Sequence, residues 1–572
     1  MRTRPIFCSL LVLAGLLSAR LDGDACTNVI ISKGASADGS TLVSYAADSH
    51  VLFGELYFRK AAKWKPGTLL KVIDWDSQKP LGQIAQAGRT YQTVGNMNEH
   101  QLIIGETTYG GREELYDPQG VIDYGSLIYI TLQRARTARE AIETIAALTS
   151  EYGYASEGES FSIADPEEAW VMDLIGKGPG GKGIVWVARR VPDGYICAHA
   201  NQARIRTFPL DDPENCLYAP DVISFAREKG WYDGPDEEFS FCDAYCPIDF
   251  GEVRGCDARV WSAFNTLCDG EFIYLDENGN EVRAAASDWL DYAMGYNLGH
   301  RMPLFVKPAR KLSVKDVADV MRDHYEGTPM DMTTDIGAGG NALPYRWRPM
   351  TFTVGDKSYV NERAIATQQT GFWFVGQARG YLPDEIGGIL WFGTDDAATS
   401  YVTPIYTAST RVPDCFREGN GDMLHYSPTA SFWLNNRVAN ACYKMYNHMA
   451  AFVRARIDAF ENSQIFGGVQ ANDEKALKYY KKGRLRKVRK IVTAYSVETA
   501  QKQFADWVSL EQTLLIKFID GNVKGQDKDG SFIHSDLSVH MSGKIEHPEY
   551  TDIWKENVAK THGEIIEEKE LQ

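Results

Sequence analysis

The sequence predicts an α+β fold with a helical C-terminal extension, and three features of the 572-residue chain lead to this prediction. From residue 26 to about 450, short runs rich in Val, Ile, Thr and Tyr alternate with Gly- and Asp-containing turns, which is typical of strands. A few helical segments interrupt these runs, among them the Ala-rich stretch 137–153. After about residue 440, apolar residues recur at three- and four-residue spacing, which predicts helices with one buried face.

Residues 1–25 have the layout of a secretory signal peptide. Two arginines precede the apolar run IFCSLLVLAGLL, and small residues follow it. The run is too short to cross a membrane, which takes about 20 apolar residues, and no later stretch of that length lacks charges. Cleavage after Ala19 leaves a pro-segment, RLDGDA, whereas cleavage after Ala25 exposes Cys26 directly. We therefore expect an exported protein, periplasmic or extracellular, without a transmembrane segment.

Charge and motif content narrow the function further. The chain has a formal net charge of −17 and a pI near 5.2, and the leader carries three Arg and two Asp, so the mature chain is near −18. Such an acidic protein is not expected to use nucleic acid or an anionic membrane as its main partner. The sequence contains no His-Glu-x-x-His, Gly-x-Ser-x-Gly or Walker motif. We expect no metal and no other cofactor, and the oligomeric state is left open.

The chain has ten cysteines, of which Cys8 lies in the leader. Apart from Cys26, the remaining eight are an even number, which an exported protein can pair. Four of them fall within 27 positions without the Cys-x-x-Cys pairs of a zinc ribbon: Cys242, Cys246, Cys256 and Cys268. We predict disulfides or inert thiols rather than zinc ligands, and the sequence does not give the connectivity.

The segment after the leader predicts a β-hairpin that starts at Cys26. Residues 27–32 and 41–46 form two short β-rich runs with Asp38-Gly39 between them. A tight turn at Asp38-Gly39 would set Cys26 opposite Val51, whereas a wider loop would set it opposite Ala47 or Asp48. A carboxylate returned to the start of the chain could accept a hydrogen bond from an N-terminal amine. The alternative is an ordinary hairpin without a catalytic role.

An N-terminal Cys26 would carry a thiol and a free amine on one residue. The thiolate is the reactive form, and an unperturbed thiol has a pKa of about 8.5. An α-amine with a pKa of about 7.7 to 8.0 can take that proton near neutral pH, so nucleophile and base need no distant histidine. Lipidation of Cys26 would block the amine. The preceding residues, Gly-Asp-Ala, lack the large apolar residue that a lipidation site has three positions before its cysteine.

Seven further segments resemble, in order, one known family. After CTNVIISKGASADGSTLVSYAADS at the start, these are GNMNEHQLIIGETT (95–108), EGESFSIADPEEAWVMDL (157–174), VPDGYICAHANQARI (191–205), DARVW (257–261), MRDHYEGTPMDMT (321–333), WFGTDDAATSYVTPIY (391–406) and LLIKFIDGNV (514–523). The chain resembles the bacterial dipeptidases among the cysteine N-terminal nucleophile (Ntn) hydrolases, which are related to bile salt hydrolases and penicillin V acylases. The resemblance implies a four-layer αββα sandwich.

The resemblance also implies roles for individual residues. Cys26 matches the nucleophile, with its own amine as base, and Asp48 matches the carboxylate that holds the amine. Asn201 matches the side-chain donor to the oxyanion, and the backbone N–H of Thr107 the second donor. Arg259 matches an arginine that keeps the thiolate charged.

One departure from the family pattern is plain. Relatives have an arginine three residues before the aspartate, and this chain has Tyr45 there. We expect either Arg259 or another basic residue to compensate for the lost cation.

The sequence favours a dipeptidase that cleaves a small amide substrate through a thioester on Cys26. A dipeptidase must recognise a free ammonium group, and Glu106, beside the expected oxyanion donor, is the candidate carboxylate; Tyr45 is a second candidate substrate contact. The first alternative is an acylase of bile salts or penicillin V with the same machinery. The second is a lipid-anchored binding protein without activity. Asp395-Asp396 and residues 322–329 are expected to be structural or to line the substrate site.

We expect four regions: a signal peptide or pro-segment (1–25), a catalytic domain (26–450), a helical region (451–530) and a polar tail (531–572) that is partly disordered. Within the helical region, Ser496 is the predicted N-cap of a helix that stops at Gly521. The basic run at 478–490 predicts a solvated helix face or an internal ion-pair surface rather than a nucleic-acid site.

Overall fold

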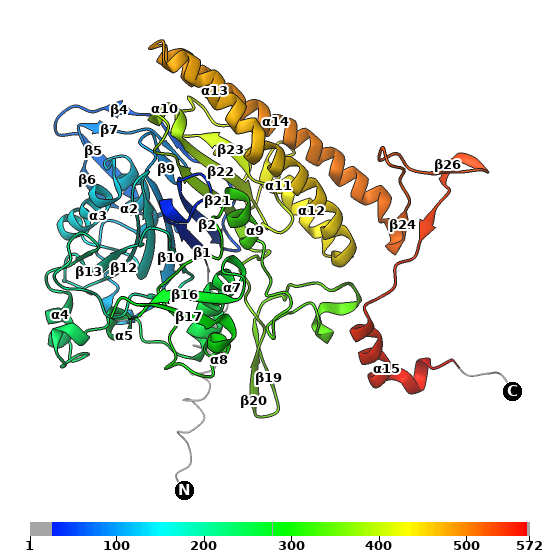
Figure 1. The fold of residues 1–572 in the computed structure, drawn as a ribbon, viewed down its shortest axis with the longest axis horizontal. Coiled ribbons are helices and arrows are strands. Elements are labelled where there is room, and N and C mark those ends of the chain that lie inside the picture. The colour runs from blue at the N-terminus through cyan, green and yellow to red at the C-terminus, as the bar shows by residue number, and fades with distance from the viewer. Residues whose placement is uncertain (1–25, 277, 569–572) are drawn as a thin grey trace, which may run out of the picture.

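The computed structural model describes residues 26–276 and 278–568 (Figure 1). The predicted leader, residues 1–25, lies outside the described residues. The described chain mixes helices with two large sheets in which all strand pairings are antiparallel, so the predicted α+β class is confirmed. None of the described helices combines the length and the apolar character needed to cross a membrane.

The first large sheet has seven strands, and the predicted N-terminal hairpin lies at its centre. The strand order is β18-β14-β1-β2-β21-β22-β23. The strands are β18 (Phe305–Val306), β14 (Ile196–His199), β1 (Thr27–Ile31), β2 (Thr41–Asp48), β21 (Thr370–Ala378), β22 (Gly388–Thr394) and β23 (Thr403–Tyr406). Every residue of β1 and β2 is buried, as expected of strands that are covered on both faces.

The second large sheet has eight strands in the order β15-β13-β12-β11-β10-β9-β8-β3. They are β15 (Cys216–Tyr218), β13 (Ile184–Arg190), β12 (Ala169–Gly176), β11 (Gly158–Ala164), β10 (Ile103–Tyr109), β9 (Met97–Asn98), β8 (Thr93–Val94) and β3 (Phe58–Arg59). Strand β9 pairs with β10 only at Ile103. One edge of β10 beyond Ile103 is therefore not covered by a strand.

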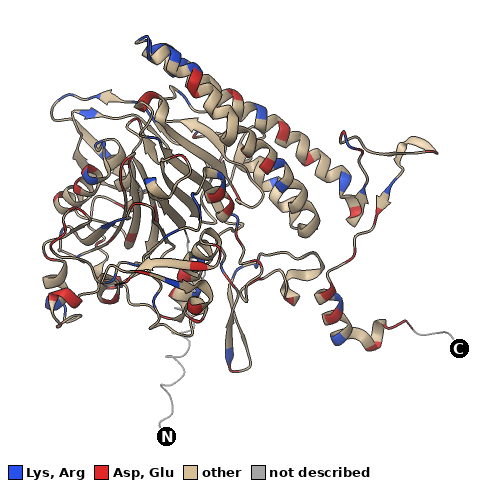
Figure 2. Cartoon of the chain, in the orientation of Figure 1, with Lys and Arg blue, Asp and Glu red and all other residues tan. Residues whose placement is uncertain are grey.

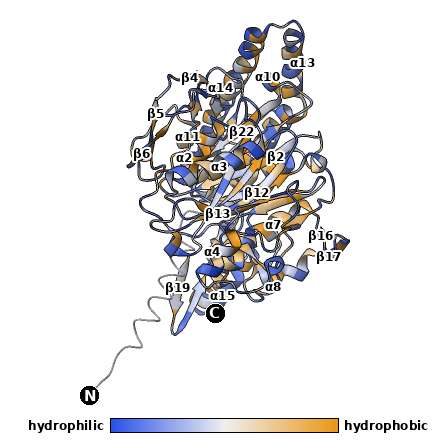
Figure 3. Cartoon of the chain, turned by 90° about the vertical axis from the view of Figure 1, so that its left-hand side faces the viewer, coloured by the Kyte–Doolittle hydropathy of each residue, from blue (hydrophilic) through white to orange (hydrophobic). Residues whose placement is uncertain are grey.

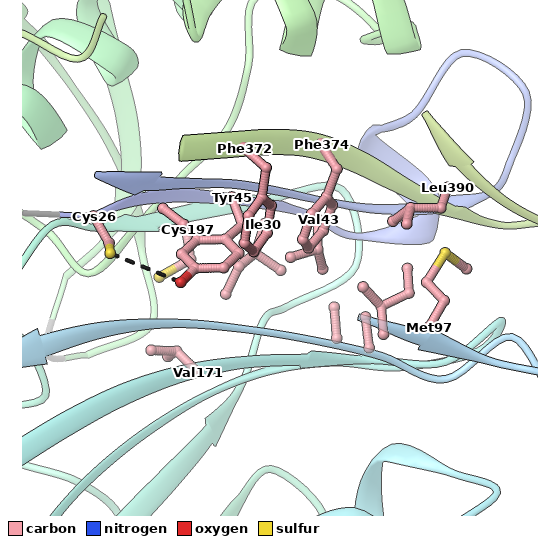
Figure 4. Close-up of a cluster of buried hydrophobic side chains, with 14 of the residues drawn as sticks. Cys26, Ile30, Val43, Tyr45, Met97, Val171, Cys197, Phe372, Phe374 and Leu390 are labelled. Carbon is pink, nitrogen blue, oxygen red and sulfur yellow. Dashed lines mark hydrogen bonds between the residues drawn. The ribbon is translucent and has the colours of Figure 1, made fainter. Parts of the chain in front are cut away.

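The two sheets pack face to face over an apolar core. Val43, Phe374 and Leu390 of the first sheet and Ile103 and Val171 of the second belong to this core and are completely buried. Figure 4 shows Val43, Phe374, Leu390 and Val171 between the sheets, and Figure 3 shows that hydrophobic residues concentrate in the central strands. Burial of each such side chain contributes about 1.5–3 kcal/mol to folding.

Helices cover the outer face of each sheet. Helices α2 (Tyr124–Leu132) and α3 (Ala138–Tyr152) pack on the eight-stranded sheet through a second core, which includes Ile142 and Phe161. The predicted helix at 137–153 is thus confirmed, with Thr137 as its N-cap. On the seven-stranded sheet a third core includes residues of α7 (Ala258–Leu267), α9 (Val314–Val320), α13 (Val469–Tyr480) and α14 (Leu485–Lys517).

The remaining elements are further helices, of which α12 is the longest with 18 residues, and two-stranded pairs. The helices are α4 (Val222–Glu228), α5 (Phe241–Tyr245), α6 (Phe250–Glu252), α8 (Leu290–Ala293), α10 (Asp384–Gly387), α11 (Ser431–Cys442), α12 (Tyr446–Ser463) and α15 (Asp552–Ile566). The two-stranded pairs are β4 (Ala62–Lys63) with β7 (Arg89–Thr90), β5 (Leu69–Ile73) with β6 (Pro80–Ala85), β16 (Glu271–Leu275) with β17 (Glu281–Ala285), β19 (Thr351–Val354) with β20 (Lys357–Val360), β24 (Val523–Lys524) with β27 (Ile545–Glu546) and β25 (His534–Ser535) with β26 (Ser538–Ser542).

The C-terminal helices differ from the sequence prediction at one boundary. Helix α14 begins at Leu485, so Ser496 is not an N-cap but a buried residue inside the helix, where its hydroxyl accepts the N–H of Tyr406. The helix extends further upstream because Val488 and Val492 are buried too. The basic run spans the turn between α13 and α14, and its Lys and Arg residues colour the projecting tip of the ribbon blue in Figure 2. Residues 552–566 of the predicted polar tail form helix α15.

Candidate active site

Cys26 directly precedes β1 and is almost completely buried, with 8% of its surface exposed. In the β1–β2 ladder Thr27 pairs with Ala46, which sets Cys26 opposite Ala47 and one residue from Asp48. Of the two registers considered from the sequence, the wider loop is therefore correct. A helical turn at Lys33–Ala35 lengthens the connection before Gly39, which adopts a positive φ of 77°.

Two polar side chains lie beside the sulfur of Cys26. The Sγ atom is 3.7 Å from Oε1 of Glu106 and 3.8 Å from the hydroxyl of Tyr45, and Figure 4 shows the second contact. The Tyr45 hydroxyl donates a hydrogen bond to the same Oε1 of Glu106. Burial raises the pKa of the Cys26 thiol well above its ordinary value, and the carboxylates of Glu106 and Asp48 raise it further. These surroundings favour the neutral thiol over the thiolate.

Arg259 connects Cys26 to Asn201. It is completely buried at the start of α7, after a π-helical turn at Val253–Asp257. Its Nη1 donates to the carbonyl oxygen of Cys26 (2.5 Å) and to the hydroxyl of Thr27 (2.9 Å), while Nη2 donates to Oδ1 of Asn201 (3.0 Å). Arg259 thus contacts the backbone of Cys26 rather than its sulfur.

Asn201 lies at the edge of the cavity in a left-handed backbone conformation, with φ 56°. Asparagine tolerates this conformation better than most residues. Because Oδ1 accepts from Arg259, the amide orientation is fixed, and Nδ2 donates to the carbonyl oxygen of Thr108 (2.6 Å). The second hydrogen on Nδ2 remains available for another acceptor.

Asp48 is completely buried and is held by residues from a distant part of the sequence. Its Oδ2 accepts from Nη2 of Arg363 (2.5 Å) and its Oδ1 accepts from the hydroxyl of Thr370 (2.6 Å). Burial raises the pKa of Asp48, and Arg363 and Thr370 oppose that shift. Sequence analysis left room for a basic residue other than Arg259 near the site, but nothing in the sequence pointed to Arg363.

The prediction for Thr107 needs a correction of one residue. The backbone groups of Ile104 bond to Asn96, and those of Glu106 face the side-chain amide of Asn28, so both sets point away from β11. Backbone groups alternate between the two edges of a strand, so the N–H of Thr107 points into the β10–β11 ladder. The N–H of Thr108 faces the open edge instead, beside the bond from Asn201 to the Thr108 carbonyl.

The hydroxyl of Thr107 contacts His199, a residue that sequence analysis did not single out. Nδ1 of His199 lies 2.8 Å from the Thr107 hydroxyl, and Nε2 lies 2.7 Å from the hydroxyl of Ser162. Burial lowers the pKa of His199 to about 3. His199 is therefore neutral, and both of its ring nitrogens are already bonded, to Thr107 and Ser162. We assign it a structural role between the sheets rather than the role of a base for Cys26.

A cavity of about 940 Å³ opens beside Cys26. Five of the predicted site residues line it: Cys26, Tyr45, Asp48, Glu106 and Asn201. Among its described lining residues are six carboxylates, Asp48, Glu55, Asp76, Glu106, Glu418 and Asp422, but two cations, Arg59 and Lys71. Aromatic side chains form much of the remaining wall, with Tyr57, Trp75 and Tyr129 packed against one another. The cavity favours a cationic group combined with apolar surface.

Two segments that were expected to be structural or substrate-lining do not line this cavity. Asp396 accepts a hydrogen bond from Tyr345, which also contacts His324, in a buried network. Arg322 forms an ion pair with Glu461, in which the guanidinium and carboxylate are both buried (2.6 Å). These contacts give both segments a structural role.

The nine described cysteines are all free, so the inert-thiol alternative fits the described residues. The cluster at Cys242, Cys246 and Cys268 is buried, and burial raises the pKa of each of these thiols. One group of side chains in the described chain has metal-ligand spacing, namely Asp319, Asp458 and Glu461. Lys315 forms ion pairs with all three carboxylates, which explains their proximity without a metal ion.

The site thus combines a buried thiol at the end of an acidic cavity with an amide donor nearby. Residues 58–458 match the family model of peptidase family C69, and the chain belongs to this family. The matched residues include Glu106, Asn201 and Arg259 but start after Cys26 and Asp48. The family match therefore does not cover Cys26, and its role as nucleophile stays a prediction from the motif at residues 26–49.

Several curated relatives carry dipeptidase names. A probable dipeptidase of Salmonella dublin is 24% identical over 405 residues, which cover 67% of this chain and 81% of the relative. A probable dipeptidase of Latilactobacillus sakei is 24% identical over 459 residues (77% and 85%). Dipeptidase A of Lactobacillus helveticus is 23% identical over 466 residues (77% and 85%). The resemblance drawn from the sequence motifs is confirmed.

Proposed function

We propose that the protein is an exported dipeptidase that hydrolyses an amide bond through a thioester on Cys26, after removal of the segment before it. Family membership and the names of the relatives support the peptidase activity. The observation that carries the proposal is the 3.7 Å contact between Sγ of Cys26 and the buried carboxyl group of Glu106 in an acidic cavity.

The contact supports recognition of a free amino terminus. In a dipeptide the ammonium nitrogen is two bonds, each of about 1.5 Å, from the carbonyl carbon that the thiol attacks. A carboxylate that lies 3.7 Å from the attacking sulfur is therefore placed where it can accept a hydrogen bond from that ammonium group. An N-acylated substrate would bring an amide to the same carboxylate and lose this charge-assisted bond.

The proposed mechanism uses the N-terminal amine of the mature chain. The amine takes the proton of the neutral Cys26 thiol, and Asp48, one residue away across the ladder, holds the amine. The thiolate attacks the carbonyl carbon and forms a tetrahedral oxyanion, to which Nδ2 of Asn201 and the N–H of Thr108 donate. Collapse of the intermediate transfers the proton to the leaving amine and leaves a thioester, which water then hydrolyses with the same amine as base.

The fold supports this assignment. Two antiparallel sheets share a core, and helices pack on the outer face of each. We interpret this arrangement as the four-layer αββα sandwich of the Ntn hydrolases, with the nucleophile at the start of a central strand.

An acylase of N-acyl amides is the second candidate, favoured by one observation. A cavity of about 940 Å³ with aromatic walls exceeds what a small dipeptide fills and could hold a large acyl group. A lipid-anchored binding protein fits less well, because the sulfur of Cys26 is buried against Glu106 and Tyr45 inside the protein, whereas a membrane anchor has to extend from the surface.

The test is hydrolysis of unblocked dipeptides by the mature protein, measured as the release of free amino acids. Cys26→Ala should abolish hydrolysis, and Cys26→Ser should retain little because a hydroxyl is much harder to ionise than a thiol. Cys415→Ala, at a partly buried cysteine that does not line the cavity, is the matched control and should keep full activity. Turnover by an enzyme whose Cys26 is fully alkylated would contradict the assignment, and faster cleavage of penicillin V or glycocholate would favour the acylase.

A further inference from the structure

A second buried carboxyl group, Glu159, lies beside Glu106. Strands β10 and β11 pair so that Glu159 is opposite Thr108, two residues from Glu106, and the three side chains share one face of the sheet. Glu106 and Glu159 are 1% and 0% exposed. Each carboxyl group acts on the pKa of the other, which indicates that the two groups lie close together.

Each of the two carboxyl groups has one oxygen atom that accepts a hydrogen bond and one that does not. Oε1 of Glu106 accepts from Tyr45, and Oε1 of Glu159 accepts from the hydroxyl of Thr108 (2.7 Å). Oε2 of each residue is buried, and no donor from the described residues reaches it. A buried acceptor without a donor is costly, and a proton held by one carboxyl group can serve as the donor to the other. Two carboxylates at such a site cannot both ionise easily.

The surroundings favour the protonated form. Burial and the neighbouring carboxylate raise the pKa of Glu159, and burial also raises the pKa of Glu106. The other titratable groups that act on the pair come from several elements and are acids, phenols or the thiol: Cys26, Tyr45, Asp76, Tyr109, Tyr124, Tyr129, Tyr154 and Glu157. None of these groups carries a positive charge that could stabilise a second carboxylate.

We propose that Glu159 stays protonated at neutral pH and donates its proton to Oε2 of Glu106, so that the pair carries one negative charge beside Cys26. Glu159 is then a positioning residue, because it fixes the carboxylate of Glu106 without touching the substrate. One negative charge matches the single positive charge of a substrate ammonium group. This match rests on the proposed function. A second charge would oppose formation of the Cys26 thiolate.

Glu159→Gln and Glu159→Leu test the proposal in the mature protein. Glutamine keeps a donor to Glu106 and an acceptor for Thr108 but cannot ionise, so it mimics the protonated acid. Leucine leaves Oε2 of Glu106 without a donor. Iodoacetamide alkylates Cys26 at a rate that mass spectrometry of the Cys26 peptide can measure. We expect this rate at pH 7 to be the same in Glu159→Gln as in the wild-type protein. If Glu159 is ionised, the same substitution removes a negative charge, and Cys26 reacts faster at pH 7 than in the wild-type protein, which would overturn the proposal.

Infrared difference spectroscopy provides a second readout that needs no substrate. The wild-type minus Glu159→Gln spectrum at pH 7 should contain the C=O stretch of a protonated carboxyl group, and a spectrum with carboxylate bands alone would overturn the proposal. Hydrolysis adds a third: kcat/KM on dipeptides should stay within about threefold in Glu159→Gln and fall by about tenfold or more in Glu159→Leu. Equal losses in both folded variants count against the proposal. If no dipeptide is cleaved, the proposed function fails while alkylation and infrared spectra still decide the state of Glu159.

Discussion

Arg363 and Asp48 form an ion pair inside the protein, 2.5 Å from Nη2 to Oδ2, with side chains that are 4% and 0% exposed. Asp48 is adjacent to the residue opposite Cys26, so the pair fixes the carboxylate beside the proposed catalytic amine. Arg363 is a basic residue that sequence analysis did not single out, and it binds the carboxylate of Asp48. Its compensation for the tyrosine at position 45 stays a prediction.

Removal of Arg363 should destabilise the fold. Arg363→Met leaves a buried carboxylate without its cation, and we expect the free energy of unfolding to fall by about 3–5 kcal/mol, measured by urea denaturation. The matched control is Arg283→Met, which breaks an exposed ion pair with Glu271 (side chains 59% and 51% exposed) and should cost less than about 1 kcal/mol. Asp48→Asn in the Arg363→Met background should recover part of the loss. Equal losses for Arg363→Met and Arg283→Met would contradict the assigned role.

Asn201 should act on the chemical step. Asn201→Gly removes the amide donor and keeps the left-handed backbone, which alanine would strain. We expect kcat to fall by about 10²–10³ with little change in KM, because the donor bonds the oxyanion rather than the substrate carbonyl. Steady-state kinetics on a dipeptide measure the split. A raised KM with unchanged kcat would assign Asn201 to substrate binding instead.

Glu106 should discriminate between free and blocked substrates. We expect N-acetylation of a dipeptide to lower kcat/KM by at least about tenfold, or about 1.4 kcal/mol of lost binding, and Glu106→Gln to remove most of that difference. Glu55→Gln is the control. Glu55 lines the same cavity, but its carboxylate accepts a hydrogen bond from the N–H of Gly419 (2.7 Å) instead of contacting Cys26. Undiminished discrimination in Glu106→Gln would place the ammonium elsewhere.

His199 should make the fold sensitive to acid. Its pKa is lowered by burial to about 3, from an ordinary value of 6.5. Between these values the unfolded chain binds a proton at His199 and the folded chain does not, so stability is lost as pH falls below about 6.5 and the loss ends near pH 3. The slope from this residue reaches about 1.4 kcal/mol per pH unit.

The measurement is the difference in unfolding free energy between wild type and His199→Gln as pH is lowered from about 7 to about 4. Glutamine keeps a donor and an acceptor for Thr107 and Ser162 but does not titrate. The wild-type protein should lose stability faster than the variant. Parallel curves would show that His199 does not carry this dependence.

Sequence patterns predicted those parts of the site whose residues lie close together in the sequence. The β-rich runs on either side of a turn predict the hairpin and the return of Asp48 to Cys26. The length of the turn, and with it the strand register, came only from the structure. Thr108 was missed because the direction of a backbone N–H depends on which edge of β10 is paired, and residue types do not record this. Arg363 and Glu159 were missed because their partners are set by tertiary packing. The start of α14 was misplaced for the same reason: Ser496 is a good N-cap by type, but burial of Val488 and Val492 extends the helix.

The central claim is that the active enzyme begins with Cys26 and uses its free amine as the base. The most direct measurement is N-terminal sequencing, together with intact mass, of the purified protein at its highest specific activity. The account predicts the sequence Cys-Thr-Asn-Val and an unmodified amine. A fully active preparation that begins at Arg20, or one in which the amine of Cys26 is acylated, would contradict it.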